Sequence, residues 1–173
     1  MNIVQCTFER HAGAILEIFN EAILSSTAIY EYELRTPEFM IGWFKDKQAG
    51  KFPVIGIEDS AGALLGFATY GVFRARPAYK YSVEHSVYVH IDHRGKGVGK
   101  RLVAEVIQCA RAQDYHVIVG GIDEQYKGSI AFHERLGFTH AGTVKQVGFK
   151  FGQWLDLAFY QLILDTPRNP ADG

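Results

Sequence analysis

The sequence predicts one domain of mixed α and β structure, α+β or α/β in class, built on a largely antiparallel sheet. Segments whose apolar residues recur at helical spacing alternate along the chain with short β-branched or alternating segments. Two pairs of predicted strands lie close enough in sequence to form hairpins, and a strand–helix–strand unit lies between them. With 173 residues, of which 47% are hydrophobic, the chain is long enough for one domain with a full core.

The first part of the chain predicts two helices and a hairpin. Thr36 precedes Pro37 and Glu38, the pattern of an N-cap followed by proline at the first helical position. Residues 59–62 (DSAG) form a turn between two apolar runs. The predicted elements are a strand over 1–7, a helix over 11–23, an irregular segment over 25–34, a helix from 37 to Gly50, and strands over 52–57 and 64–70.

The second part predicts the strand–helix–strand unit and a final strand pair. The elements are a loop over 72–80, a strand over 83–90, a helix from Val98, a strand over 116–122, a helix over 127–136 closed by Gly137, and strands over 139–146 and 155–164 joined through 148–152. Residues 165–173 hold two prolines and few apolar residues, which predicts a flexible tail. The domain therefore covers residues 1–164.

Composition excludes several classes of protein. A formal net charge of −1 gives no long-range attraction to nucleic acid or to an anionic membrane. No apolar stretch reaches the roughly 18 residues that a membrane span needs, and the start lacks a signal peptide, so we expect a cytoplasmic protein. Cys6 and Cys109 are far apart, which predicts two reduced thiols. His85, His90 and His93 lie at odd spacing without a cysteine, so we expect no metal site.

A glycine-rich loop at residues 94–99 (RGKGVG) lies between the strand over 83–90 and the next helix. Glycines let a backbone approach a phosphate, and a helix start offers unpaired N–H groups to it. The spacing fails both the G-x-G-x-x-G fingerprint of dinucleotide sites and the Walker A pattern, because Lys100 or Leu102 stands where the third glycine should be and Arg94 where the first Walker glycine should be. The pattern that remains is R-x-x-G-x-G. Its alternative interpretation is a structural strand-to-helix turn with surface lysines.

Four motifs in sequence carry a family resemblance. They are residues 82–89 (SVEHSVYV), 94–99 (RGKGVG), 129–138 (SIAFHERLGF) and 147–156 (VGFKFGQWLD). Together they resemble the phosphinothricin and methionine sulfoximine N-acetyltransferase branch of the GCN5-related N-acetyltransferase (GNAT) superfamily, over nearly the whole chain apart from the tail. The resemblance implies the GNAT fold, a central, mostly antiparallel twisted sheet flanked by helices, and transfer of acetyl from acetyl-CoA to an amine.

The resemblance also implies which residues bind the co-substrate. The backbone of the strand at Val87 to Val89 pairs with the pantetheine arm in the family, and the glycine loop holds the pyrophosphate. The family has Asn where this chain has Tyr126, so that position departs from the pattern. The implied acetyl-CoA-binding residues are Val87, Tyr88, Val89, Arg94, Gly95, Lys96, Gly97, Val98, Gly99, Lys100 and Tyr126.

Two residues are candidate catalytic groups. Glu84 stands where the family places its catalytic glutamate, and a carboxylate there can deprotonate the amine directly or through a water; the alternative is a solvated glutamate at a strand start. His85 should point to the opposite sheet face. His133 matches a family tyrosine near the coenzyme sulfur and suits a general acid; the alternative is a histidine bonded to a helix carbonyl.

The loop over 72–80 carries the predicted acceptor-binding residues. Related enzymes use arginine at the positions of Arg74 and Arg76 for the amino acid's carboxylate, which a guanidinium binds through two hydrogen bonds. Tyr79 and Lys150 are further candidates, beside Glu84 itself. The predicted function is thus N-acetylation of a small amino-acid-like amine, in a protein that we expect to be a homodimer. The alternatives are a protein N-terminal or polyamine acetyltransferase and a non-catalytic acetyl-CoA-binding module.

Overall fold

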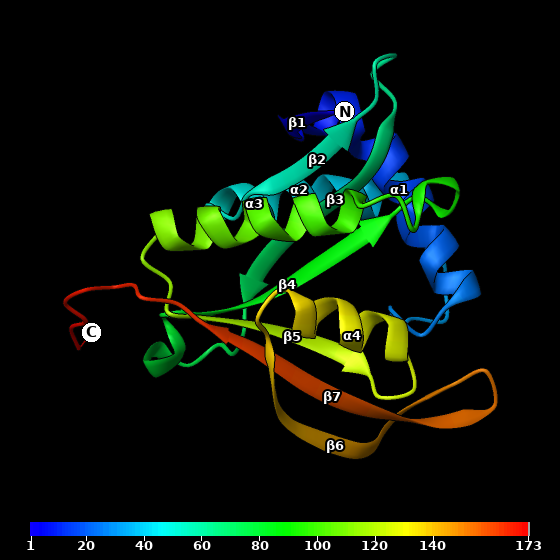
Figure 1. Cartoon of the computed structure of the whole chain (residues 1–173). Coiled ribbons are helices and arrows are strands. Elements are labelled where there is room, and N and C mark those ends of the chain that lie inside the picture. Colours follow the sequence, from blue (N-terminus) through cyan, green and yellow to red (C-terminus); the bar gives the residue numbers. More distant parts are fainter. Residues whose placement is uncertain (173) are drawn as a thin grey trace. The chain divides into compact units, whose positions relative to one another are not determined.

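The computed structural model in Figure 1 describes residues 1–172. Contacts divide the chain into two compact units, one of residues 1–71 and 86–106 and the other of residues 72–85 and from Ile107 onward. The first contains β1 (Asn2–Gln5), α1 (Phe8–Ser25), α2 (Pro37–Ala49), β2 (Val54–Glu58), nearly all of β3 (Leu64–Val72), η2 (Ile91–His93) and the start of α3 (Val98–Ala112). The second contains η1 (Pro77–Tyr79), β5 (Val117–Asp123), α4 (Lys127–Arg135), β6 (Thr139–Lys150) and β7 (Gln153–Ile163). Strand β4 (Ser82–Val89) contributes to both units.

The strands form a seven-stranded sheet in the order β1-β2-β3-β4-β5-β7-β6. The β4–β5 pair is parallel, whereas the β1–β2, β2–β3, β5–β7 and β6–β7 pairs are antiparallel. A parallel pair needs a long crossover connection, and here α3 supplies it. The predicted fold class, mixed α and β with a mostly antiparallel sheet, is therefore confirmed.

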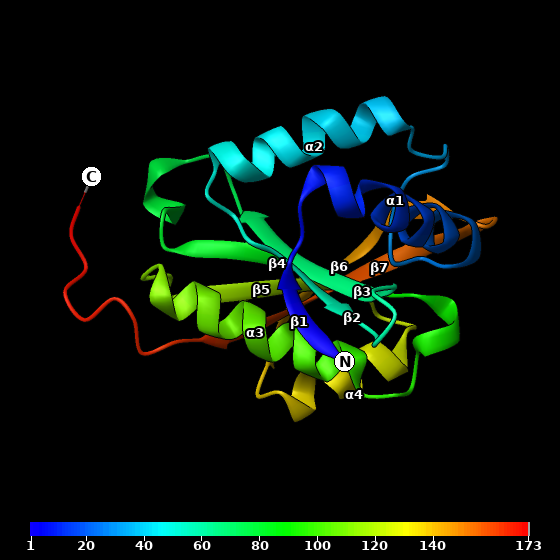
Figure 2. The same ribbon diagram turned by 90° about the horizontal axis from the view of Figure 1, so that it is seen from above.

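In the first unit, α1 and α2 lie on one side of strands β1 to β3 and the start of α3 lies on the other (Figure 2). Phe19 of α1 is the centre of the aromatic packing, since its ring centroid lies 5.0 Å from that of Phe67, 5.6 Å from that of Trp43 and 5.2 Å from that of Tyr88. Edge-on aromatic pairs at such distances stabilise a core beyond their buried area. This packing fixes the end of β4 from the side of α1.

Helix α1 begins three residues earlier than predicted. The Thr7 side chain makes no cap bond; instead the backbone N–H of Thr7 donates to Nδ1 of His11 at 2.9 Å. The other ring nitrogen, Nε2, lies 3.0 Å from the buried Glu58 carboxylate on β2. Because the capping group comes from inside the helix and is held by a distant strand, no local pattern indicates this start. Helix α2 has the predicted cap, since Thr36 Oγ1 accepts from the backbone N–H of Phe39.

In the second unit, the final strand pair is longer than predicted. Strand β6 continues to Lys150 and pairs with Gln153, so the connection is only Phe151 and Gly152, not residues 148–152. Both have positive φ, 52° and 74°, as a type I′ hairpin turn requires. Gly148 lies within the ladder and follows a register shift, so it was a misleading turn signal.

The segment after β7 is partly anchored. Thr166 Oγ1 donates to the carbonyl of Tyr115, and the backbone N–H of Ala171 donates to the Tyr81 hydroxyl at 3.1 Å. The flexible tail over 165–173 remains a prediction, and these contacts limit it at Thr166 and Ala171. Within residues 1–172, no helix has the length and apolar character that crossing a bilayer demands.

Candidate functional site

The glycine loop of the first unit has the shape of an open cradle. Gly95 and Gly97 have φ of 75° and 79°, values that favour glycine, and a Cβ on either would meet nothing within 4 Å. Val98 is fully buried and anchors the start of α3, while residues 94–97 are exposed. The first backbone N–H groups of a helix have no intrahelical acceptor, so this loop presents them to solvent with the positive end of the helix dipole.

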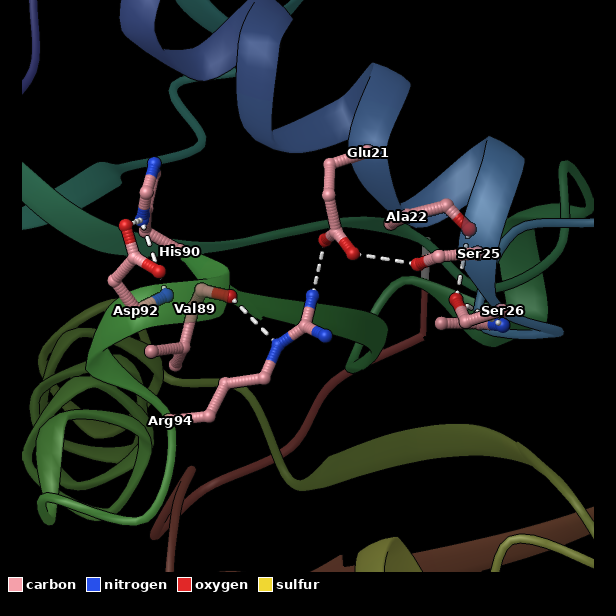
Figure 3. A network of polar contacts seen from close by, with 9 residues as sticks. Glu21, Ala22, Ser25, Ser26, Val89, His90, Asp92 and Arg94 are labelled. Atoms are coloured by element: carbon pink, nitrogen blue, oxygen red, sulfur yellow. Dashed lines mark hydrogen bonds and ion pairs between the residues drawn. The ribbon is translucent and has the colours of Figure 1, made fainter.

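Arg94, the first residue of the motif, is held by protein groups (Figure 3). Its Nε donates to the Val89 carbonyl at the end of β4 at 3.1 Å, and its Nη2 donates to the Glu21 carboxylate on α1. Glu21 also accepts from the Ser25 hydroxyl. The side chain thus links α1 to the end of β4.

The lysines and the strand complete this part of the site. Lys96 donates to the backbone carbonyl of Asp92 at 2.8 Å, and Lys100 is exposed beside the loop. On β3, a Cβ on Gly66 would lie 2.7 Å from the carbonyl oxygen of Tyr88. Glycine is therefore required at residue 66, because it lets β3 approach the backbone of β4.

In the second unit, Glu84 and Arg74 form one group. Arg74 Nη1 lies 3.9 Å from Glu84 Oε2, and the two side chains are 50% and 37% exposed. The guanidinium lies over the Phe73 ring at 4.3 Å and near the Phe159 ring at 5.9 Å. Partial burial raises the pKa of Glu84, and the nearby Arg74 charge opposes that shift. A carboxylate with a raised pKa that is still accessible is suited to taking a proton near neutral pH.

His85 is adjacent to Glu84 in sequence but is buried on the opposite face of the strand, as predicted. Its Nε2 lies 3.2 Å from Nε2 of His133 on α4. His133 Nδ1 lies 2.8 Å from the Ser129 carbonyl, which can only accept, so Nδ1 carries the proton. Nε2 of His133 must then accept from Nε2–H of His85. Nδ1 of His85 is consequently a bare acceptor, and no hydrogen bond reaches it from the described residues.

This pairing keeps both imidazoles neutral. Burial lowers the pKa of His85 to about 3, with the neighbouring His133 as a second cause. Burial also lowers the pKa of His133, against the effect of the Ser129 carbonyl. The single N–H of His133 is bonded to its own helix, so the geometry favours the structural interpretation of His133 over the general-acid interpretation.

The other predicted residues are spread over the second unit. Arg76 and Tyr79 are exposed on the loop around η1, where the Tyr79 ring lies 5.8 Å from that of Phe73. Tyr126 is half exposed at the N-cap of α4. Lys150 is buried beside the β6–β7 turn, with its ammonium 4.9 Å from the centre of the Phe151 ring. Of the predicted acceptor residues, Arg74 and Glu84 are therefore the pair that the structure brings together.

Sequence reasoning missed Phe73, Phe159 and Glu21. Phe73 precedes Arg74, so an aromatic next to a loop arginine was an available signal. Phe159 reaches Arg74 only through the register of β7 on β5. Glu21 is a half-buried residue of α1, and only the tertiary contact with Arg94 indicates a role.

Comparison with known proteins decides the family. The family model described as "Acetyltransferase (GNAT) family" matches residues 14–138, which is most of the chain. The chain belongs to the GNAT acetyltransferase family. The match includes most of α1, all of β4, the glycine loop and α4, and it ends before β6 and β7.

Relatives of known name agree with the branch predicted from the motifs. An L-methionine sulfoximine/L-methionine sulfone acetyltransferase of Pseudomonas aeruginosa is 44% identical over 90% of each chain. A provisionally assigned acetyltransferase from Acinetobacter baylyi is 54% identical, with a TM-score of 0.98 over 99% of this chain and 96% of that one. A phosphinothricin acetyltransferase from Sinorhizobium meliloti, solved in complex with acetyl-CoA, is 32% identical, with a TM-score of 0.92 over 98% and 91%.

As a GNAT member the chain is an acyltransferase that uses acetyl-CoA. The residues present fit this co-substrate. The cradle at Gly95 and Gly97 is open where any side chain would obstruct a pyrophosphate, and Lys100 adds positive charge beside it. One continuous strand, β4, carries both Val87 to Val89 of the first unit and Glu84 of the second.

Proposed function

We propose that this protein is an acetyl-CoA-dependent N-acetyltransferase for the α-amino group of a small amino-acid-like substrate. Methionine sulfoximine, methionine sulfone and phosphinothricin are the substrates that we infer, since relatives across nearly the full chain are named for them. The observation that carries the proposal is the Arg74–Glu84 group. The two charged groups lie 3.9 Å apart and are partly exposed, which supports Glu84 as the proton acceptor and Arg74 as the cation for a substrate carboxylate.

Glu84 is the proposed general base. An α-ammonium group cannot attack a carbonyl until it loses a proton, and the half-exposed carboxylate takes that proton directly or through one water. Burial raises the pKa of Glu84, which makes the difference from the pKa of the amine smaller. Proton transfer from the amine to the carboxylate is favoured by this shift. Acetyl-CoA, when bound, supplies the thioester carbonyl that the free amine attacks.

Arg74 is the proposed anchor for the substrate's carboxylate. Its guanidinium lies over the Phe73 ring and is half exposed, and Nη1 donates to the Phe73 carbonyl at 2.7 Å. The group is thereby oriented, and a guanidinium has further N–H donors for a carboxylate. Arg76 and Tyr79 extend the same loop and are proposed as weaker contacts, as is Lys150 elsewhere in the unit. Tyr126 is proposed as a contact for acetyl-CoA rather than for the amine. A cationic site of this kind suits an amino acid better than a polyamine, which needs carboxylates.

For the co-substrate, we propose that the backbone of Val87 to Val89 and the loop from Gly95 to Lys100 bind the pantetheine arm and the pyrophosphate. Arg94 supports this loop through its bonds to Val89 and Glu21. An amide on the strand, fixed toward the thioester oxygen, would stabilise the oxyanion, an effect worth about 3 kcal/mol for one donor.

We also propose a cytoplasmic homodimer. Its support is the exposed apolar surface on the β6–β7 hairpin, where Phe149, Phe151 and Trp154 are 46%, 57% and 59% exposed. Large exposed aromatic surface is typical of subunit interfaces. Both cysteines are free thiols, as a reducing compartment permits.

The test is thiol release from acetyl-CoA with a panel of amines. Methionine sulfoximine, methionine sulfone and phosphinothricin should be acetylated, whereas spermidine and an N-terminal peptide should not. Turnover of spermidine or the peptide alone would replace the proposed substrate class. Binding of acetyl-CoA with no turnover across the panel would indicate a non-catalytic module.

A further inference from the structure

We propose that Gly121 is a positioning residue that provides the seat for the Glu84 carboxylate. The inference rests on the proposed role of Glu84 as general base and adds a residue that acts through it. Gly120 and Gly121 are adjacent glycines inside the central strand β5, where glycine weakens a sheet. A reason is therefore needed for each of them.

The contacts around Gly121 give the reason for the second glycine. A Cβ built there would lie 3.2 Å from Glu84 Oε1, 3.3 Å from Leu157 Cδ1 and 3.9 Å from Phe159 Cε1. The first two distances are shorter than ordinary van der Waals contact. Glu84 pairs in register with Val119, and residues two apart on a strand share a face, so its side chain leans along β5 onto residue 121. The carboxylate thus occupies the space that a side chain at residue 121 would take.

The requirement is for space rather than for unusual backbone. Neither Gly120 nor Gly121 is among the positive-φ residues of the described chain, so an alanine could adopt either backbone conformation. The seat also distinguishes the two oxygens of Glu84. Oε1 rests over the Gly121 backbone while Oε2 faces Arg74 at 3.9 Å. A neighbour on each side limits the directions that the carboxylate can take, and a base needs a defined direction for proton transfer.

Gly120 is a matched control on the opposite face. A Cβ there would lie 2.9 Å from His85 Nε2 and 3.5 Å from His133 Nε2. It therefore seats the neutral histidine pair, which has no part in the proposed chemistry. One methyl group added to either of two adjacent residues thus probes two different neighbours.

The experiment compares Gly121→Ala and Gly120→Ala in the full chain, each alone and with Glu84→Gln. Gly121→Ala should lower kcat about tenfold, because the carboxylate must move by a few tenths of an ångström, and leave the KM for acetyl-CoA within twofold. Gly120→Ala should lower Tm more and leave kcat per folded molecule within twofold. Gly121→Ala added to Glu84→Gln should lower kcat no further, since the group it positions is already lost.

Two results would contradict the proposal that Gly121 positions the Glu84 carboxylate. One is a parent-like kcat for Gly121→Ala when Glu84→Gln is strongly impaired. The other is an equal loss from Gly121→Ala with and without Glu84→Gln, which would mean that it acts elsewhere. A parent-like kcat for Glu84→Gln instead overturns the proposed base. If Gly121→Ala alone does not fold, the double variant Gly121→Ala/Leu157→Ala is used, because it removes the close contact with Leu157. Its kcat is compared with that of Leu157→Ala alone.

Discussion

Glu84 and His85 are neighbours on one strand, both are titratable, and they have opposite fates. Glu84 is 37% exposed at its side chain and lies beside an arginine, whereas His85 is sealed against His133 and Phe138. The alternation of side chains along β4 sends them to opposite faces of the sheet. The comparison teaches that a titratable residue becomes a candidate for chemistry through access and a charged partner, not through its type or its place in a motif.

The strongest test of this contrast between Glu84 and His85 is to remove the base. Glu84→Gln keeps the shape of the side chain but cannot take a proton, so kcat should fall about 10²- to 10³-fold at pH 7. The acid limb of the kcat/KM profile, which follows the raised pKa of Glu84, should disappear. Steady-state kinetics from pH 5 to 9 measures both.

Acetyl-CoA affinity serves as the control for that variant and should be unchanged, because the proposed loop contacts are not touched. Retained turnover with an unchanged acid limb would remove Glu84 from the base role.

The next prediction concerns the buried face of the sheet, where His85 meets His133. His133→Phe removes the acceptor for Nε2–H of His85, beside an Nδ1 that already lacks a described partner. An unpaired buried donor costs about 1–3 kcal/mol, so the free energy of unfolding should fall by roughly that amount in a urea titration. The matched control is His140→Phe, because His140 is exposed on β6 and should change stability by less than about 0.5 kcal/mol.

The same variant decides the role of His133. If it were the general acid, kcat per folded molecule would fall as well as stability. A loss of stability with kcat retained supports the structural interpretation.

Lowering the pH should reduce stability through the buried His85–His133 pair. The unfolded chain protonates its histidines below about pH 6.5, whereas folded His85 has a pKa of about 3 and the pKa of folded His133 is lowered by burial. The unfolded state then binds more protons, so stability is complete above pH 6.5 and declines as the pH falls below it. We expect a loss of about 1–2 kcal/mol between pH 7.5 and 5.5.

Urea titrations at the two pH values measure that loss. Replacing both histidines with leucine should flatten the dependence, and an equal dependence in that variant would assign it to other groups.

A smaller effect separates the two arginines of the loop. Arg74→Ala should raise the KM for the amine about tenfold and leave the KM for acetyl-CoA unchanged, because the carboxylate loses its partner. It should also move the acid limb to higher pH, since the Arg74 charge lowers the pKa of Glu84. Arg76→Ala is the control and should not move that limb. Equal shifts in both variants would contradict a specific Arg74–Glu84 pair.

The fold and part of the site could be predicted because they depend on residues that are close together in the sequence. The glycine loop, the Thr36 cap and the alternation that separates Glu84 from His85 all depend on spacing within one segment. Phe159 could not be found this way, since it reaches Arg74 only through the register that places it opposite Gly121 on β5. The early start of α1 depends likewise on His11 meeting Glu58, 47 residues away in sequence. What sequence reasoning missed is what the packing of distant strands creates.

The smallest effect asks whether Arg94 supports the loop or binds phosphate itself. Glu21→Ala removes a partly exposed ion pair, worth at most about 1 kcal/mol, so the KM for acetyl-CoA should change only about two- to threefold. Its sign is decisive. If Arg94 is a support, losing Glu21 loosens the loop and raises the KM. If Arg94 is a phosphate ligand restrained by Glu21, the variant releases it and lowers the KM. Glu17→Ala, one turn earlier on α1 and exposed, is the control and should change nothing. The direction of this shift extends the contrast between Glu84 and His85 to the co-substrate loop, where a charged residue in the motif either contacts the ligand or holds the backbone that does.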